Sequence, residues 1–116
     1  MHVLQQIDVS RRGLGAEDAE VIRNVLRSNP QLAVLKLGYN NFGDKGATII
    51  ASSCSKAKGG RHHQGLTVLD LGFNSIGDEG ATEISLHMIA GNHMLRNLYL
   101  AGNDFKLKGA MAIAGA

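Results

Sequence analysis

The amino-acid sequence predicts an α/β fold, a solenoid of four strand-turn-helix repeats. Three observations predict this fold. A pattern of leucines, one asparagine and a Gly-Asp pair recurs along the chain. In each copy, apolar residues first alternate and then recur at helical spacing. The copies follow one another at intervals of roughly thirty residues, a period typical of solenoids.

The clearest copy of the pattern spans residues 66–81, LTVLDLGFNSIGDEGA. The copy that begins at Leu32 has the same residue types at every patterned position, except that Phe42 replaces an isoleucine. The copy that begins at Leu95 keeps the leucines and the asparagine, but Lys106 and Leu107 replace the Gly-Asp pair. The first copy begins at Leu4 and is weaker, because Arg12 stands at the asparagine position. A single unit of this kind cannot bury its own apolar face, so the four are expected to stack.

The residues around the second and third leucines predict a short strand in each unit, as at 34–37 and 68–71, because apolar and other residues alternate there. The residues after the glycine predict a helix, because apolar side chains recur at positions i, i+3 and i+7. The three clearest stripes are Ala19, Ile22 and Leu26; Ala47, Ile50 and Cys54; and Ala81, Ile84 and Met88. Each stripe gives its helix one apolar face.

The chain is expected to form a single domain over residues 1–116. Its repeats are placed at about 1–28, 29–62, 63–91 and 92–116. Between the second and third repeats, residues 55–65 are basic and rich in glycine, which predicts an inserted flexible loop. Neither end carries a recognisable polar cap, so we expect either a segment of a longer array or a chain that self-associates through its uncapped repeat ends.

The turn between strand and helix carries the recurring polar residues. Asp44 and Asp78 come just before their helices, where a carboxylate can accept free backbone N–H groups and meet the positive end of the helix dipole. We therefore interpret both as helix caps. Asn40, Asn74 and Asn103 follow their strands, and stacked asparagines can satisfy backbone groups at successive turns. Most of the fifteen glycines fall in the same regions and mark recurring turns.

The motif LxxLxLxxN followed by GDxGA resembles the ribonuclease-inhibitor type of leucine-rich repeat, and the resemblance covers nearly the whole chain. Proteins that share this repeat type include ribonuclease inhibitor, the sensor domains of NLR receptors and the GTPase-activating proteins for Ran. The resemblance implies a right-handed horseshoe arc, in which a parallel sheet lines the concave side and helices cover the convex side. It identifies the architecture and leaves the partner open.

Composition and motifs exclude several function classes. The formal net charge is +2, from twelve basic and ten acidic residues, so we expect neither a nucleic acid nor a membrane as partner. One cysteine, Cys54, and the absence of a glycosylation sequon favour a reducing, cytoplasmic location. No nucleophile, metalloprotease or phosphate-loop motif is present, so we expect no enzyme, no catalytic residue and no cofactor. His62 and His63 suggest a metal site, but adjacent histidines chelate poorly, so a solvated loop is favoured and no metal is expected.

The side chains between the buried leucines are expected to face solvent on the concave side, where a protein partner would bind. The predicted contact residues are Arg11, Val34, Lys36, Tyr39, Val68, Asp70, Phe73, Asn97 and Tyr99. Tyr39 and Phe73, with Arg11 beside them, have the composition of a protein-interaction hot spot. Alternatively, the two rings simply stack over the neighbouring glycines and cover the backbone. The row Asp8, Lys36 and Asp70 is interpreted mainly as charge compensation between strands.

The sequence therefore predicts a protein-binding module whose partner is unknown, and two alternatives stay open. The first is a regulator of a small GTPase, for which Arg11, Arg12 and Asp104 are the candidate residues near one rim. The second is a structural fragment that self-associates through its repeat ends.

Overall fold

The computed structural model describes residues 5–54, 65–90 and 94–115. The predicted loop at 55–65 lies outside these residues except for Gly65, and so do Leu4, His62 and His63. In chain order the elements are β1 (Gln6–Asp8), the 3₁₀ turn η1 (Ala16–Asp18), α1 (Ala19–Ser28), β2 (Val34–Lys36), α2 (Gly43–Ser52), β3 (Val68–Asp70), α3 (Asp78–Ile84), the π-helical turn η2 (Ser85–Ile89), β4 (Asn97–Tyr99) and α4 (Leu107–Ala114).

The four strands form one parallel sheet in the order β1-β2-β3-β4. The register follows the repeat, because Leu35 lies opposite Leu69, which lies opposite Leu98. The predicted strands and their alignment are confirmed. Each strand has only three residues, and backbone hydrogen bonds between the repeats continue beyond it, as from Leu37 to the carbonyl oxygen of Asp70 at 2.9 Å.

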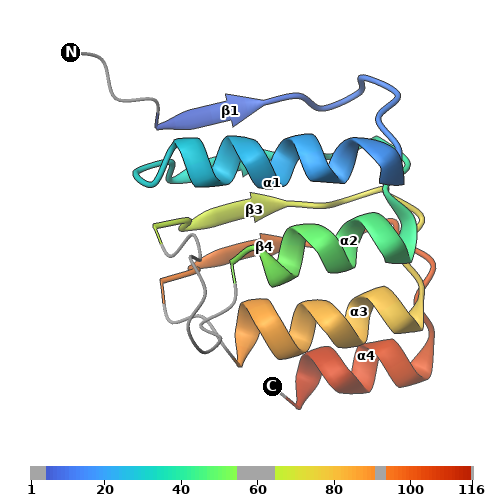
Figure 1. The fold of residues 1–116 in the computed structure, drawn as a ribbon. Helices are drawn as coiled ribbons and strands as arrows, with labels where there is room; N and C mark the ends of the chain where they lie inside the picture. Colours follow the sequence, from blue (N-terminus) through green and yellow to red (C-terminus); the bar gives the residue numbers. More distant parts are fainter. Residues whose placement is uncertain (1–4, 55–64, 91–93, 116) are drawn as a thin grey trace.

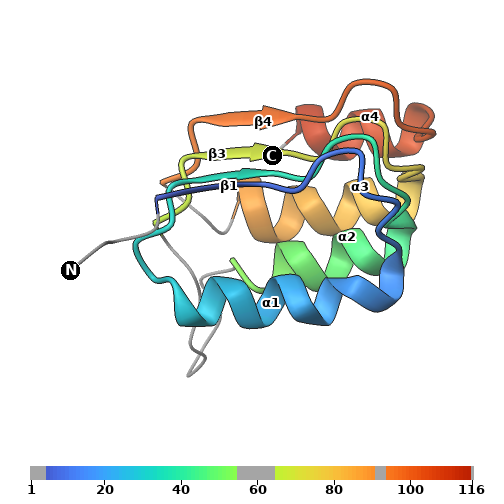
Figure 2. The ribbon, with the colours of Figure 1, turned by 90° about the horizontal axis from the view of Figure 1, so that it is seen from above.

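Figures 1 and 2 show the two layers of the molecule, in which the four α-helices lie side by side in chain order against one face of the sheet. Parallel strands are spaced about 4.8 Å apart, whereas packed helices need about 8–10 Å. The helical layer therefore requires more width per repeat than the sheet. An array of such units bends with the sheet on the inside, as the sequence predicts for a solenoid.

The core lies between the sheet and the helices. The patterned leucines of the two central repeats, such as Leu35 and Leu69, are fully buried, and so are the predicted helical stripes around Ile50 and Ile84. The corresponding leucines of the last repeat are only partly buried: Leu95, Leu98 and Leu100. The repeat pattern aligns Phe105 with Phe42 and so predicts that both are buried; Phe42 is, whereas Phe105 is only half-buried, so that prediction is wrong for Phe105.

The recurring aspartates do not cap their own helices. The carboxylate of Asp44 accepts hydrogen bonds from the backbone N–H groups of Gly77 (2.7 Å) and Gly80 (2.8 Å), at the start of α3. In the same way, Asp78 accepts from Lys106 (2.6 Å) and Gly109 (2.8 Å), at the start of α4. Each aspartate therefore caps the helix of the next repeat. The prediction that these aspartates cap helices is confirmed, but the prediction that each caps its own helix is wrong. Stacking of the repeats places the start of the next helix within hydrogen-bond distance of the carboxylate.

Three of the patterned glycines, Gly46, Gly80 and Gly109, lie inside helices rather than in turns. They allow a close approach between repeats. A Cβ at Gly80 would lie 2.6 Å from Asp44 Oδ1, and a Cβ at Gly109 would lie 2.8 Å from Asp78 Oδ1. Glycine at this position therefore makes room for the carboxylate that caps the helix.

Candidate functional site

The turn that follows each strand is held by an asparagine that bonds to the neighbouring repeats. Asn74 is fully buried, and its amide nitrogen donates to the carbonyl oxygen of Leu37 at 2.9 Å. Asn103 accepts from the backbone N–H groups of Asn74 (2.8 Å) and Ile76 (3.1 Å). The predicted asparagine ladder is confirmed, because these amides satisfy backbone groups at successive turns.

That shared turn places one residue of each repeat in the left-handed backbone region. The φ angles are 59° at Arg11, 56° at Tyr39, 55° at Phe73 and 73° at Gly102. The N–H groups of the first three donate across the array: Arg11 to the carbonyl oxygen of Gly38 (3.0 Å), Tyr39 to that of Gly72 (2.9 Å) and Phe73 to that of Ala101 (2.9 Å). Side chains at this position consequently project from the same point of successive turns, one strand spacing apart.

Arg11, Tyr39 and Phe73 form a continuous stack, here called the stacked strip. The rings of Tyr39 and Phe73 lie 4.4 Å apart between centroids and 8° from parallel. The Arg11 guanidinium carbon lies 3.8 Å from the centroid of the Tyr39 ring. The other face of Phe73 lies against Gly102, where a Cβ would approach the ring to 2.3 Å. Both residues are nevertheless 45% exposed.

The two interpretations of the aromatic pair can therefore be combined. The rings do stack and do cover backbone, but the glycine beneath them is Gly102 and not the row that contains Gly38 and Gly72. The carboxylate of Asp70 lies against that row instead, 3.3 Å from the position of a Cβ at Gly38 and 3.2 Å from one at Gly72. The ring faces have a structural role, and the ring edges face solvent.

The charged row does not form ion pairs between strands. Within the described residues, no carboxylate of this row lies within 4.0 Å of Lys36. Asp8 accepts from the backbone N–H of Ser10 (3.0 Å), and Asp70 accepts from that of Gly72 (2.9 Å). Hydrogen bonds from Ser10 lower the pKa of Asp8, with a smaller contribution from the charge of Lys36. Charge compensation is thus a minor effect, and each aspartate mainly closes its own turn.

The remaining predicted contact residues lie on the solvent side of the same sheet. Val34 and Val68 are opposite one another and half-buried, and Asn97, which is exposed, continues their row. Tyr99 lies opposite Asp70 and is 54% exposed. It belongs to the charged row and not to the stacked strip. The structure thus places all nine predicted residues on one face, in three parallel rows.

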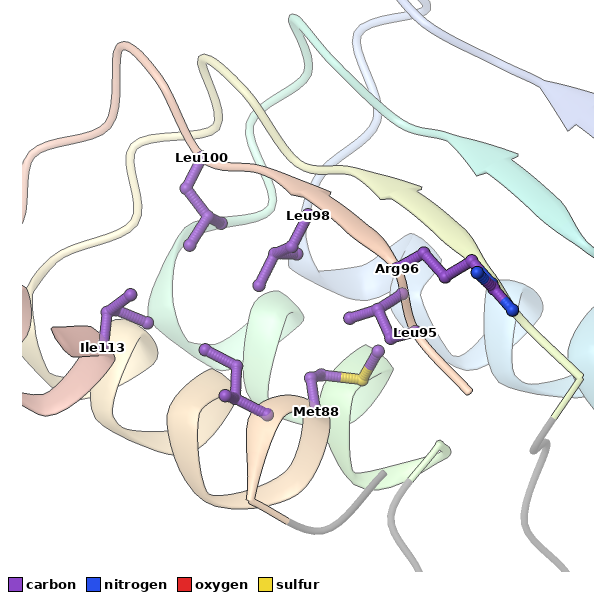
Figure 3. A pocket seen from close by; sticks show the side chains of 7 residues that line it. Met88, Leu95, Arg96, Leu98, Leu100 and Ile113 are labelled. Carbon is purple, nitrogen blue, oxygen red and sulfur yellow. The ribbon is translucent and has the colours of Figure 1, made fainter. Parts of the chain in front are cut away.

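A second feature of the surface is a hollow of about 280 Å³ beside the last repeat (Figure 3). It is lined by Met88, Ile89, Leu95, Arg96, Leu98, Leu100 and Ile113. Leu98 of β4, with Leu95 before the strand and Leu100 after it, lies on the side that faces Met88 and Ile113. Four further apolar side chains of the same repeat are exposed: Met94, Tyr99, Leu107 and Met111. The hollow lies beside the partly buried leucines of the last repeat, Leu95, Leu98 and Leu100, at the flank of the core.

No metal centre or reactive thiol emerges from the part of the chain that the structure describes. It contains no group of three or more His, Cys, Asp or Glu side chains that could hold a metal ion. Burial raises the pKa of Cys54 to about 12, so the thiol stays protonated and packs as a small apolar group. None of the described helices is long and apolar enough to cross a membrane.

Comparison with family models decides the family. Residues 28–51, 62–85 and 91–114 each match the model described as Leucine Rich repeat. The chain belongs to the leucine-rich repeat family. The matches cover the second, third and fourth repeats, and the first repeat, with Arg12 at the asparagine position, lies outside them. A comparison with curated proteins gave no match. Leucine-rich repeats generally mediate protein–protein interaction, so the concave face is the surface of interest.

Proposed function

We propose that this leucine-rich repeat chain is a protein-binding module of the ribonuclease-inhibitor type, which holds its partner on the concave face around the stacked strip. The observation that carries the proposal is the strip itself. Three bulky residues at equivalent turns adopt a left-handed backbone and present their side chains as one half-exposed surface.

The energetics of the strip support a role beyond stability. A left-handed conformation costs an L-residue about 1–2 kcal/mol, and it occurs here at Arg11, Tyr39 and Phe73. An aromatic pair stabilises the fold by about 0.5–1.5 kcal/mol, and an exposed cation–π contact by about 0.5–1 kcal/mol. The stacking contacts therefore offset only part of the backbone cost of the three residues. Glycine, as at position 102, fits the same turn without that cost, so the large side chains are best explained by what they contact.

The finer parts of the proposal rest on the repeat type. The spacings from Leu4 to Leu32 and from Leu66 to Leu95, and an α-helix in every repeat, are features that the ribonuclease-inhibitor type would have. We include in the proposal that the chain is not an enzyme and that it works in the cytoplasm, which the single buried Cys54 favours.

The test is a double substitution, Tyr39→Ala with Phe73→Ala, compared with Val21→Ala with Leu86→Ala. The control pair is also apolar and exposed, at 58% and 59%, but lies on helices. We expect both variants to fold, and only the Tyr39→Ala, Phe73→Ala variant to lose capture of partner proteins from cell extract. Titration of the captured protein then measures how strongly each variant binds it. Equal capture by the wild type and both variants would rule out the strip as the binding surface.

The alternative as a regulator of a small GTPase has no specific observation in its favour. The Arg11 guanidinium is held on the Tyr39 ring. Asp104 lies three repeats away, at about 14 Å for strands spaced about 4.8 Å apart. A single-turnover GTP hydrolysis assay with candidate GTPases tests this alternative directly, since acceleration of hydrolysis by the chain would support it.

Self-association is favoured by one observation, the apolar flank of the last repeat. Leu107 is 74% exposed and Met111 65% exposed, next to the hollow under β4. A second copy is the occupant we consider, since the edge of β4 can pair with another strand. Sedimentation over a concentration series should then show a dimer that Leu107→Glu abolishes. A wild-type monomer at the highest concentration would exclude this candidate.

A further inference from the structure

We infer that the stacked strip recognises an acidic segment of the partner protein, in which an Asp or Glu carboxylate bonds to the guanidinium of Arg11. This inference rests on the proposed function and specifies the chemistry of the same surface. It follows from which parts of the stacked groups remain free.

The faces of both aromatic rings are already in use. Phe73 is covered by Tyr39 on one side and by Gly102 on the other, and Tyr39 lies between Phe73 and Arg11. Each of these two residues is 45% exposed, and with the ring faces covered, the aromatic surface left to solvent consists of the ring edges and the Tyr39 hydroxyl. Ring edges carry the positive end of the aromatic quadrupole, so they favour contact with oxygen atoms that carry negative charge.

Arg11 adds a full positive charge to that edge. Stacking on Tyr39 covers one face of the guanidinium and leaves its in-plane N–H groups as the polar surface. Within the described residues, Arg11 makes no ion pair. The nearest row of carboxylates is engaged by backbone N–H groups, at Asp8 and Asp70. A guanidinium held flat and without a carboxylate partner is preorganised for a bidentate bond.

The same geometry argues against nucleic acid as the ligand. Proteins bind single strands by stacking bases on free aromatic faces, and neither ring offers one. A backbone of phosphates would also require an extended basic surface, whereas the formal net charge is only +2 and Asp70 lies in the adjacent row. A protein carboxylate needs one oriented guanidinium and an apolar rim, which is what the strip provides.

The test uses a library of short random peptides displayed on phage. Peptides are selected on the wild-type chain and counter-selected on the Tyr39→Ala, Phe73→Ala double variant, so that only binders that need the strip survive. We expect these binders to be enriched in Asp and Glu. For the best peptide, exchange of its acidic residues for Asn or Gln should weaken binding about tenfold or more, as expected for charge-assisted hydrogen bonds.

Variants of the protein identify the cation. Arg11→Gln should weaken binding of the selected peptide about as much as removal of the peptide's charge does. Arg11→Lys should weaken it by an intermediate amount, because lysine keeps the positive charge but lacks the planar guanidinium fork. Arg27→Gln, an exposed arginine on α1, is the matched control and should bind as the wild type does.

The outcomes separate this inference from the function it rests on. Strip-dependent binders without acidic residues, or acidic binders indifferent to Arg11→Gln, would overturn the acidic-segment inference and leave the protein-binding surface in place. Tighter, Arg11-dependent binding of an oligothymidylate strand would assign the site to phosphates instead. If no selected peptide depended on the strip, the inference and the proposed binding surface would both fail.

Discussion

At the scale of single residues, the position just after each strand combines a backbone requirement with a recognition role. Arg11, Tyr39 and Phe73 occupy the left-handed region that glycine adopts most easily, and Gly102 shows the same turn without a side chain. The side chain at this position is therefore not needed for the turn. It is available for contacts across the sheet face, which is the basis of the proposed function.

A pair of alanine substitutions separates backbone strain from ring contact. Gly13 and Gly102 have similar φ angles, 68° and 73°, but a Cβ at Gly13 meets nothing within 4 Å, whereas one at Gly102 meets the Phe73 ring. Gly13→Ala should lower the free energy of unfolding by about 1 kcal/mol through backbone strain alone. Gly102→Ala should lower it by roughly 1–3 kcal/mol more, as overpacking does.

Urea unfolding measures both changes, and the near-ultraviolet circular dichroism of Gly102→Ala reports whether the rings have moved. Equal losses of stability in the two variants would mean that Phe73 does not rest on position 102 in solution.

At the scale of secondary-structure elements, the repeats are joined by side chains that reach in both directions. Asn74 and Asn103 reach back to the carbonyl groups of the preceding repeat. Asp44 and Asp78 reach forward to the N–H groups of the next helix. The starts of α3 and α4 thus depend on a residue of the preceding repeat. The stability of one helix should accordingly respond to a substitution in another.

Substitution of Asp44 tests this dependence. Asp44→Ala removes the acceptor for Gly77 and Gly80, and loss of such a cap typically lowers stability by about 0.5–2 kcal/mol. Hydrogen exchange should accelerate at these two amides, at the start of α3, more than at the start of α2. Lys45→Ala, at an exposed neighbouring position, is the control. Faster exchange confined to α2 would contradict the capping assignment.

Acid should remove the stability that Asp78 contributes by capping the start of α4. Hydrogen bonds from the N–H groups of Lys106 and Gly109 lower the pKa of this carboxyl below its ordinary value of 3.8. A depressed folded-state pKa means that the contribution is complete above the unfolded pKa and is lost as the pH falls through the folded pKa. The difference in melting temperature between the wild type and Asp78→Asn should therefore be largest near neutral pH and shrink below about pH 4.

Melting curves from acidic to neutral pH measure this difference, with Glu79→Gln as the control for loss of a nearby exposed carboxylate. A difference that stayed constant over the whole range would show that the Asp78 charge does not contribute to capping.

At the scale of the whole molecule, the array has a closed centre and an open last repeat. Leu69 and Leu98 occupy the same position of the motif and face each other across β3 and β4. Leu69 is fully buried, whereas Leu98 lines the hollow and is only partly buried. Burial thus depends on the place of a repeat in the stack as well as on the motif.

The same substitution at the two positions should therefore have unequal effects. Leu69→Ala should lower the free energy of unfolding by roughly 2–5 kcal/mol, the range for a fully buried leucine. Leu98→Ala should lower it by less than half as much, because part of its surface already contacts water. Urea denaturation of both variants gives the comparison, and equal losses would indicate that the hollow is filled in solution, as in the dimer considered above.

Much of the fold and of the candidate site follows from periodicity alone. Alternation along each short strand places Val34, Lys36 and their equivalents on the solvent side, and helical spacing selects the buried stripe around Ile50. These patterns are local, because the geometry of a strand or a helix determines which neighbours in the sequence share a face. The sequence by itself therefore determined the repeat, the strands, the helices and the nine residues of the concave face.

Only the tertiary structure decided which residues meet across repeats. The stacking of Arg11 on Tyr39 and the capping of α3 by Asp44 each join residues of two successive repeats. No pattern within one repeat contains these contacts, since they depend on the height and rotation at which successive units pack. The left-handed backbone at Tyr39 and Phe73 was equally hidden, because neither residue type favours it, and the inter-repeat hydrogen bonds impose it.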